Sequence, residues 1–163
     1  MCRLFGLRAN RPVDLAFSFT SGERTFPQFA GRNPDGFGVG WYRKSKPDIY
    51  KRPYRADESE KLAEWTCSGQ SATWIAHVRN ATTGIVSNQN CHPFRFNNWL
   101  FAHNGSIEGR ETLQASLQPS HQSAIDGQTD SEVYFHWLLQ NIESERDINA
   151  GVRCAVAAVS GYS

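Results

Sequence analysis

Ser71-Ala72-Thr73-Trp74-Ile75-Ala76-His77-Val78-Arg79 is the stretch that most clearly decides the fold, because its side chains alternate. A period of two residues indicates a β-strand with one face toward a core. One face would carry Ala72, Trp74, Ala76 and Val78, and the other Thr73, Ile75, His77 and Arg79. The sheet that contains this strand is therefore expected to have an apolar face and a more polar one.

Further strands and helices are predicted on both sides of this stretch. Short apolar runs with turn signals between them predict strands over 2–8, 37–43, 48–54 and 98–104. Helical spacing predicts helices over 57–67, 130–143 and 147–160, with Asp57 capping the first and Asp130 or Ser131 the second. Because several connections have hairpin length, we expect an α+β fold with antiparallel pairing rather than a regular βαβ series.

The composition is that of a globular protein. The length of 163 residues predicts a single domain over 1–163, and 39% apolar and 20% charged residues suit a packed core. A net charge of +1 without a long run of one sign argues against binding to nucleic acid or to a membrane surface. The four cysteines are far apart and form no CxxC pair, which favours a reduced, cytoplasmic protein.

Cys2 follows the initiator methionine directly. If Met1 is removed, a thiol and a free α-amine share one residue, and the amine, with a pKa of about 7.7–8.0, is able to take the proton of the thiol. The alternative is that Cys2 is a small buried residue at the start of a strand, which is the usual role of a lone cysteine.

Two polar segments accompany strands 37–43 and 71–79. Asn33-Pro34-Asp35-Gly36 is a turn signal, and the glycines that alternate after it leave one strand face bare for a backbone or a ligand. Arg79 ends the other strand, and its planar guanidinium suits a carboxylate, with the Thr82 hydroxyl just beyond. Alternatively, Arg79 is a surface residue beside a threonine-rich loop, and His77 is expected to be a packed, hydrogen-bonded histidine.

Three other segments bear on the chemistry. Asn104 and Gly105 end a strand, where an amide and a backbone N–H are able to form an oxyanion hole or simply an Asn-Gly turn. Asp130 is a helix cap or an anchor for a ligand ammonium. In Asn90-Cys91-His92-Pro93-Phe94, neighbouring side chains point opposite ways, so we expect a turn there and neither a zinc site nor another cofactor.

Taken together, six segments resemble the class II glutamine amidotransferases, the N-terminal-cysteine branch of the Ntn hydrolases, and in particular the stand-alone amidotransferases. The segments follow the family's order: Cys2-Arg3-Leu4-Phe5-Gly6, Asp35-Gly36-Phe37-Gly38, His77-Val78-Arg79 with Ala81-Thr82, Asn90-Cys91-His92-Pro93-Phe94, His103-Asn104-Gly105 and Thr129-Asp130-Ser131-Glu132. The resemblance spans roughly residues 1–145. It implies an α/β/β/α sandwich of two antiparallel sheets that is truncated at the C-terminus of this chain.

The resemblance also implies roles for single residues. Cys2 would be the nucleophile, Asn104 and Gly105 the oxyanion donors, and Arg79, with Thr82, and Asp130 the anchors of the substrate's carboxylate and amino group. The implied reaction is hydrolysis of glutamine or another γ-glutamyl amide through a thioester, conditional on removal of Met1.

An incomplete sheet would leave exposed edges, which predicts a homo-oligomer or a partner subunit. The alternative function is that of a catalytically inactive relative that serves as a binding or assembly module.

Overall fold

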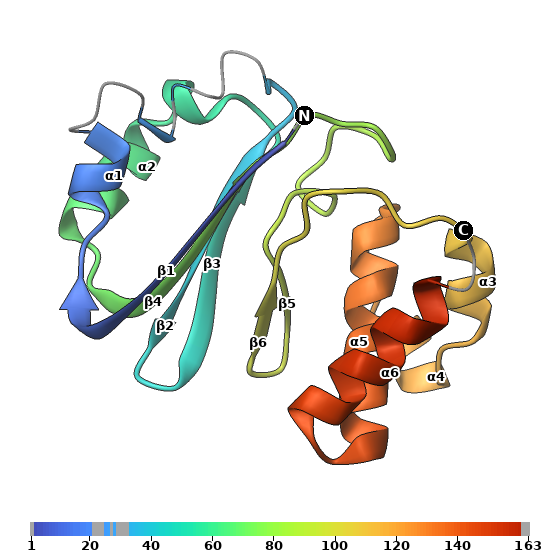
Figure 1. Ribbon diagram of the computed structural model, residues 1–163. Helices are drawn as coiled ribbons and strands as arrows, with labels where there is room; N and C mark the ends of the chain where they lie inside the picture. The colour runs from blue at the N-terminus through green and yellow to red at the C-terminus, as the bar shows by residue number, and fades with distance from the viewer. Residues whose placement is uncertain (1, 21–24, 27, 29–32, 161–163) are drawn as a thin grey trace. The chain divides into compact units, whose positions relative to one another are not determined.

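The structure is a computed structural model that describes residues 2–20, 25–26, 28 and 33–160 (Figure 1). The chain divides into two compact units, unit 1 (Met1–Asn104) and unit 2 (Gly105–Ser163), which are described separately. Met1 lies outside the described residues, so the structure does not describe the residue whose removal we expect to be needed for activity. Arg32, which precedes the turn at Asn33, also lies outside them.

Unit 1 is built on a four-stranded antiparallel sheet. Its strands are β1 (Arg3–Val13), β2 (Phe37–Arg43), β3 (Lys46–Arg52) and β4 (Ser71–Val78), in the order β1-β4-β2-β3. The strand that opened the sequence analysis, β4, lies between β1 and β2, and Val78 pairs with both Arg3 and Phe37. The predicted strands over 2–8, 37–43, 48–54 and 71–79 are confirmed.

One face of this sheet carries the core of unit 1. Helices α1 (Ala16–Thr20) and α2 (Glu60–Ser68) lie on this side of the sheet (Figure 1). The buried side chains belong to both layers and include Leu15, Phe19, Val39, Trp41, Leu62, Trp74, Ala76 and Val78. The apolar half of the alternation in β4 therefore faces the helices, as predicted.

The start of the predicted helix over 57–67 needs a correction. Asp57 lies in the short 3-10 helix η2 (Ala56–Glu58), and its carboxylate pairs with Arg55 at 2.6 Å. The cap of α2 is Ser59, whose hydroxyl accepts a hydrogen bond from the backbone N–H of Leu62. Because the guanidinium of Arg55 binds the Asp57 carboxylate, Ser59, the next residue with a short polar side chain, caps the helix instead.

The other face of the sheet is approached by a small two-stranded sheet, β5 (Phe94–Phe96) and β6 (Trp99–Phe101). The predicted strand over 98–104 is thus shorter than expected. A Cβ atom at Gly38 would clash with the carbonyl oxygen of His92, and one at Gly40 would lie 2.9 Å from Cγ of Pro93. The missing side chains at Gly38 and Gly40 therefore let the backbone around residues 92 and 93 lie close to β2. A close approach by backbone was one of the two expectations for these glycines, and a ligand was the other.

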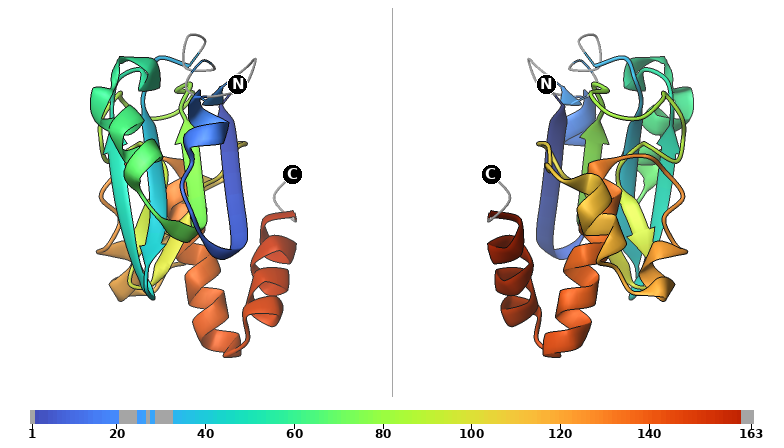
Figure 2. Two further views of the ribbon diagram at one scale, coloured as in Figure 1. Left: turned by 90° about the vertical axis from the view of Figure 1, so that its left-hand side faces the viewer. Right: turned by 90° about the vertical axis from the view of Figure 1, so that its right-hand side faces the viewer.

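Unit 2 is helical. It contains α3 (Arg110–Ala115), α4 (Pro119–Gln122), α5 (Asp130–Glu145) and α6 (Ile148–Ser160), and α5 and α6 lie side by side (Figure 2). The helices predicted over 130–143 and 147–160 are confirmed. The cap of α5 is neither Asp130 nor Ser131 but Thr129, whose hydroxyl accepts from the backbone N–H of Glu132 at 3.2 Å.

The elements together make an α+β fold with one four-stranded antiparallel sheet, a small second sheet and helices. Among the described helices, none combines the length and the apolar character that crossing a membrane requires.

Candidate functional site

The Cys2 thiol is held at the end of the β1–β4 pair. Its Sγ accepts a hydrogen bond from the backbone N–H of Asn80 at 3.2 Å and donates one to the carbonyl oxygen of Asn80 at 3.4 Å. The register explains this contact, because Arg3 pairs with Val78 and the residues just outside the ladder, Cys2 and Asn80, meet next. The thiol is only half-buried, so it is fixed without being sealed from solvent.

Asn104 reaches Cys2 from a second segment, the end of unit 1 that follows β6. Its side-chain amide donates to the backbone carbonyl oxygen of Cys2 at 3.2 Å, although Asn104 itself is exposed. The structure therefore brings together the predicted nucleophile and one of the two predicted oxyanion donors, which are 102 positions apart in sequence.

Arg79 is placed differently from a free anion-binding side chain. Its side chain is only 3% exposed, and its guanidinium donates to the backbone carbonyls of Thr83 at 2.6 Å, Ile85 at 3.2 Å and Gly84 at 3.3 Å. The guanidinium thus organises the loop after β4. Thr82 lies on this loop and is exposed.

Asp35, in the Asn33-Pro34-Asp35-Gly36 turn, is tied to the same loop. Its carboxylate accepts a hydrogen bond from the backbone N–H of Ala81 at 2.7 Å. Two backbone bonds extend the β2–β4 ladder beside it, from Asp35 N–H to the Arg79 carbonyl at 3.2 Å and from Arg79 N–H to the Gly36 carbonyl at 2.7 Å. The turn that the sequence singled out is therefore fastened to the strand end that holds Cys2.

Two buried histidines lie close to this strand end. The rings of His77 and His92 are in contact, with centroids 4.4 Å apart and ring planes tilted by 43°. Burial, together with the positive charge of Arg79, lowers the pKa of His77 to about 4, and burial takes the pKa of His92 well below its ordinary value. His77 is therefore a packed, neutral histidine at physiological pH, which confirms the expected packing. The expected hydrogen bond is not confirmed, because neither ring nitrogen makes one in the described part of the chain.

Cys91 is a buried thiol with a different environment. It is fully buried, burial raises its pKa, and its Sγ donates to the backbone carbonyl of Ser87 at 3.3 Å. A buried, protonated thiol is a poor nucleophile. All four cysteines are free of disulfides, and the Sγ of Cys2 accepts the backbone N–H of Asn80.

The remaining predicted residues belong to unit 2. Gly105 is its first residue and is exposed. Asp130 is the first residue of α5, and its carboxylate accepts from the backbone N–H of Ile107 at 2.6 Å and from that of Ser131 at 2.9 Å. Within unit 2, Asp130 thus fastens the segment before α3 to the start of α5.

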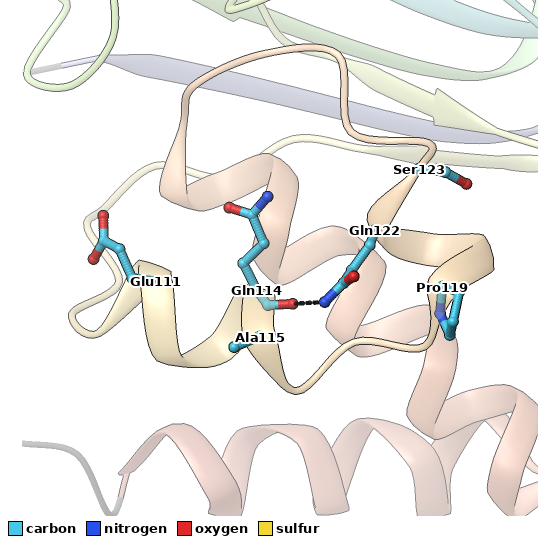
Figure 3. Close-up of a pocket in the computed structure, with 6 residues that line it drawn as sticks. All are labelled: Glu111, Gln114, Ala115, Pro119, Gln122 and Ser123. Carbon is cyan, nitrogen blue, oxygen red and sulfur yellow. Dashed lines mark hydrogen bonds between the residues drawn. The ribbon is translucent and has the colours of Figure 1, made fainter.

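A surface pocket of about 590 Å³ in unit 2 contains none of the predicted residues. In Figure 3 the side-chain amide of Gln122 donates to the backbone carbonyl of Gln114 across it, at 2.8 Å. The pocket is lined by Glu111, Gln114, Ala115, Pro119, Gln122 and Ser123. In the part of the chain that the structure describes, no three His, Cys, Asp or Glu side chains gather in a way that would hold a metal ion.

Two residues of the Cys2 environment were missed as functional candidates. Asn80 acts through its backbone, which no side-chain pattern reveals, although antiparallel pairing of 2–8 with 71–79 would have placed it beside Cys2. Asp35 was recognised only as part of a turn. Its bond to Ala81 joins residues 46 positions apart, and the sequence holds no local signal of it.

Comparison with known proteins gives a consistent picture. A family model described as "Glutamine amidotransferases class-II" matches residues 1–160. The Escherichia coli protein named "Putative glutamine amidotransferase YafJ" is 34% identical over 96% of this chain and 61% of its own length. A Haemophilus influenzae protein named "Putative glutamine amidotransferase" is 33% identical over 88% and 49%. This chain thus spans about half to three fifths of the length of these relatives.

A solved structure supports the fold. The structure of a glutamine aminotransferase class-II domain protein from Silicibacter pomeroyi superposes with a TM-score of 0.71, at 22% identity, over 99% of this chain and 65% of that chain.

Proposed function

The chain belongs to the class II glutamine amidotransferase family, and from this premise we propose that it hydrolyses glutamine or another γ-glutamyl amide through a thioester on Cys2. The observation that carries the proposal is the pair of contacts at Cys2. The thiol accepts a hydrogen bond from the backbone of Asn80, and the side-chain amide of Asn104 donates a hydrogen bond to the backbone carbonyl of Cys2. These contacts support the proposal because they bring the proposed nucleophile and a proposed oxyanion donor to one strand end.

The proposed reaction begins with removal of Met1, which leaves the α-amine of Cys2 free to act as base. The amine takes the thiol proton, and the sulfur attacks the side-chain amide carbon of the substrate. The tetrahedral oxyanion is stabilised by the side-chain amide of Asn104 and the backbone N–H of Gly105. The C–N bond breaks, the leaving amine (ammonia when the substrate is glutamine) takes the proton from the Cys2 amine, and water then hydrolyses the γ-glutamyl thioester to glutamate and the free thiol.

Arg79, Thr82 and Asp130 are proposed to hold the amino-acid end of the substrate. A guanidinium has five N–H donors, and a carboxylate is able to accept two of them in parallel. In the free protein the Arg79 guanidinium already donates to the carbonyls of residues 83–85. Binding through Arg79 therefore requires the carboxylate to compete with these carbonyls.

The finer features of the family are proposed for this chain as well. They are a single amidotransferase domain, the α/β/β/α sandwich of the Ntn hydrolases, and a cytoplasmic location. A partner subunit or a second copy is proposed to cover the edges of the small sheet, since a two-stranded sheet is marginal by itself.

The test is glutamate release from glutamine and a panel of γ-glutamyl amides, with removal of Met1 verified by intact mass. We expect glutamate together with an equal amount of the leaving amine, which is ammonia for glutamine, from at least one substrate, and neither product from protein that retains Met1, in which the Cys2 amine is acylated. A folded, processed protein that releases no glutamate from any member of the panel would instead favour the inactive binding or assembly module.

A further inference from the structure

We propose that Asp35 is a positioning residue for Cys2, acting through the backbone of residues 79–81. The inference rests on the proposed function, because it concerns the same nucleophile, and it assigns to Asp35 a role that its place in a turn does not reveal. Asp35 touches neither the thiol nor a substrate group.

Three hydrogen bonds connect Asp35 to the thiol through the backbone of residues 80 and 81. The carboxylate accepts the N–H of Ala81 at 2.7 Å, which is a short hydrogen bond. The preceding residue, Asn80, donates its own N–H to Cys2 Sγ at 3.2 Å and accepts from Sγ at 3.4 Å. Since adjacent peptide units share a Cα atom, fixing the Ala81 amide restricts the orientation of the Asn80 peptide.

The Asn80 N–H matters chemically because a hydrogen bond to sulfur favours its negatively charged form. If residues 80–82 are released, this N–H no longer points steadily at Sγ. We therefore expect loss of the Asp35 carboxylate to lower the reactivity of Cys2, while the Arg79 guanidinium keeps its bonds to the carbonyls of residues 83–85.

The carboxylate can be removed selectively. The two backbone bonds between 35–36 and Arg79 do not involve the Asp35 side chain, so the ladder beside it persists in a variant. In the described part of the chain, none of the ion pairs includes Asp35. Its acceptor oxygen, rather than its charge, is therefore the feature that should matter.

The chain offers a matched control, Asp14. This residue is also half-buried, and its carboxylate also accepts a backbone N–H, that of Ala16 at 3.0 Å. It follows the last residue of β1, whereas Cys2 precedes the first. Asp14→Ala thus removes the same kind of bond at the other end of the strand.

The experiment compares wild type with Asp35→Ala, Asp35→Asn, Asp35→Glu and Asp14→Ala. The first readout is the rate of Cys2 alkylation by iodoacetamide at pH 7, followed by peptide mass spectrometry. It requires no substrate, so it tests the inference even if the protein hydrolyses no γ-glutamyl amide. The second readout is kcat and KM for the substrate found in the panel, and thermal unfolding checks that each variant is folded.

We expect Asp35→Ala to slow alkylation and kcat by about tenfold, the scale of one hydrogen bond to a charged group, with KM unchanged. Asp35→Asn should restore both rates because its amide oxygen accepts the same N–H. Asp35→Glu, which keeps the charge but is one methylene longer, should be slower than Asp35→Asn and also serves if Asp35→Ala does not fold.

Three results would overturn the proposal. They are unchanged alkylation in the folded Asp35→Ala or Asp35→Glu protein, an equal loss in Asp14→Ala, and an Asp35→Asn protein as slow as Asp35→Glu.

Discussion

The two ends of the β1–β4 strand pair differ in what their hydrogen bonds hold. At one end, outside the pair Arg3–Val78, the backbone of Asn80 holds the Cys2 thiol. At the other end the register shifts between Arg8 and Val13, and the Trp74 indole donates to the carbonyl of Val13 at 2.9 Å. The β1–β4 pairing is thus regular at the end next to the thiol and irregular at the end next to the helices.

The difference teaches that a polar side chain at a strand end is not by itself a sign of function. Asp35 and Asp14 each accept a backbone N–H. Asp14 stabilises the start of α1, which is part of the fold, whereas Asp35 holds Ala81, and the residue before Ala81, Asn80, contacts the Cys2 thiol. What distinguishes the Cys2 end is the convergence of three separate segments, from the 33–36 turn, the loop after β4 and the end of unit 1.

The largest effect is expected from Cys2→Ala, which removes the proposed nucleophile from this end. Hydrolysis should fall to the background of the ammonia assay because no other described thiol has the same contacts. Cys67→Ala, at an exposed cysteine in α2, is the control and should keep wild-type turnover. Measurable hydrolysis by the Cys2→Ala protein would contradict the proposal that the Cys2 end of the β1–β4 pair carries the reaction.

Asn104→Ala should have the next largest effect. Loss of one oxyanion donor costs about 10²–10³ in kcat, or about 2.7–4 kcal/mol. Asn98, which is also exposed and lies between β5 and β6, supplies a control carboxamide in the same part of the chain. Steady-state kinetics should show a lower kcat for Asn104→Ala alone, and equal kcat values for the two variants would contradict the assignment.

Acid should destabilise the protein through the buried histidines near the Cys2 end. The pKa of His77 is about 4 when folded against an ordinary value of 6.5, so the unfolded state binds the proton first as pH falls. The free energy of unfolding should therefore be highest above pH 6.5 with respect to this group. It should decrease as the pH falls from 6.5 toward 4, by an amount on the order of 3 kcal/mol for His77.

Denaturant unfolding at pH 7 and pH 4.5 measures this decrease. His77→Phe should make it smaller, since it removes one such group. An equal decrease in wild type and His77→Phe would mean that other groups carry the acid sensitivity.

Arg79→Lys is expected to have a smaller effect, mainly on KM. A lysine keeps the charge but loses the paired N–H groups that bind a carboxylate in parallel, so KM should rise by about tenfold. At the other end of the strand pair, Arg8→Lys replaces an exposed arginine and should leave KM unchanged. An unchanged KM in Arg79→Lys would remove Arg79 from the carboxylate site.

Much of the fold was predictable because it follows from local side-chain patterns. The strict alternation of 71–79 identified the strand between β1 and β2, and helical spacing identified α5 and α6. The caps were wrong where a polar side chain had a competing partner, as Asp57 has in Arg55. The short helices α1, α3 and α4 were not predicted, since so few residues show no helical period.

The candidate site was predictable only where side chains carry the chemistry. Cys2 and Asn104 were named from their residue types, and they meet in the structure. The contribution of Asn80 is made by its backbone, and that of Asp35 by a tertiary hydrogen bond, so neither leaves a pattern in the sequence. Arg79 was expected to be open to a ligand, but its three bonds to loop carbonyls depend on how the chain turns after β4.

The most direct test of the central claim is labelling with diazo-oxo-norleucine, an electrophilic glutamine analogue. Protein freed of Met1 is incubated with the analogue, digested, and examined by peptide mass spectrometry, with the other three cysteines as internal controls. The account predicts a stoichiometric adduct on Cys2, none on Cys67, Cys91 or Cys154, and protection of Cys2 by glutamine. A folded, processed protein with no adduct on Cys2, or with equal labelling of the exposed cysteines, would contradict it.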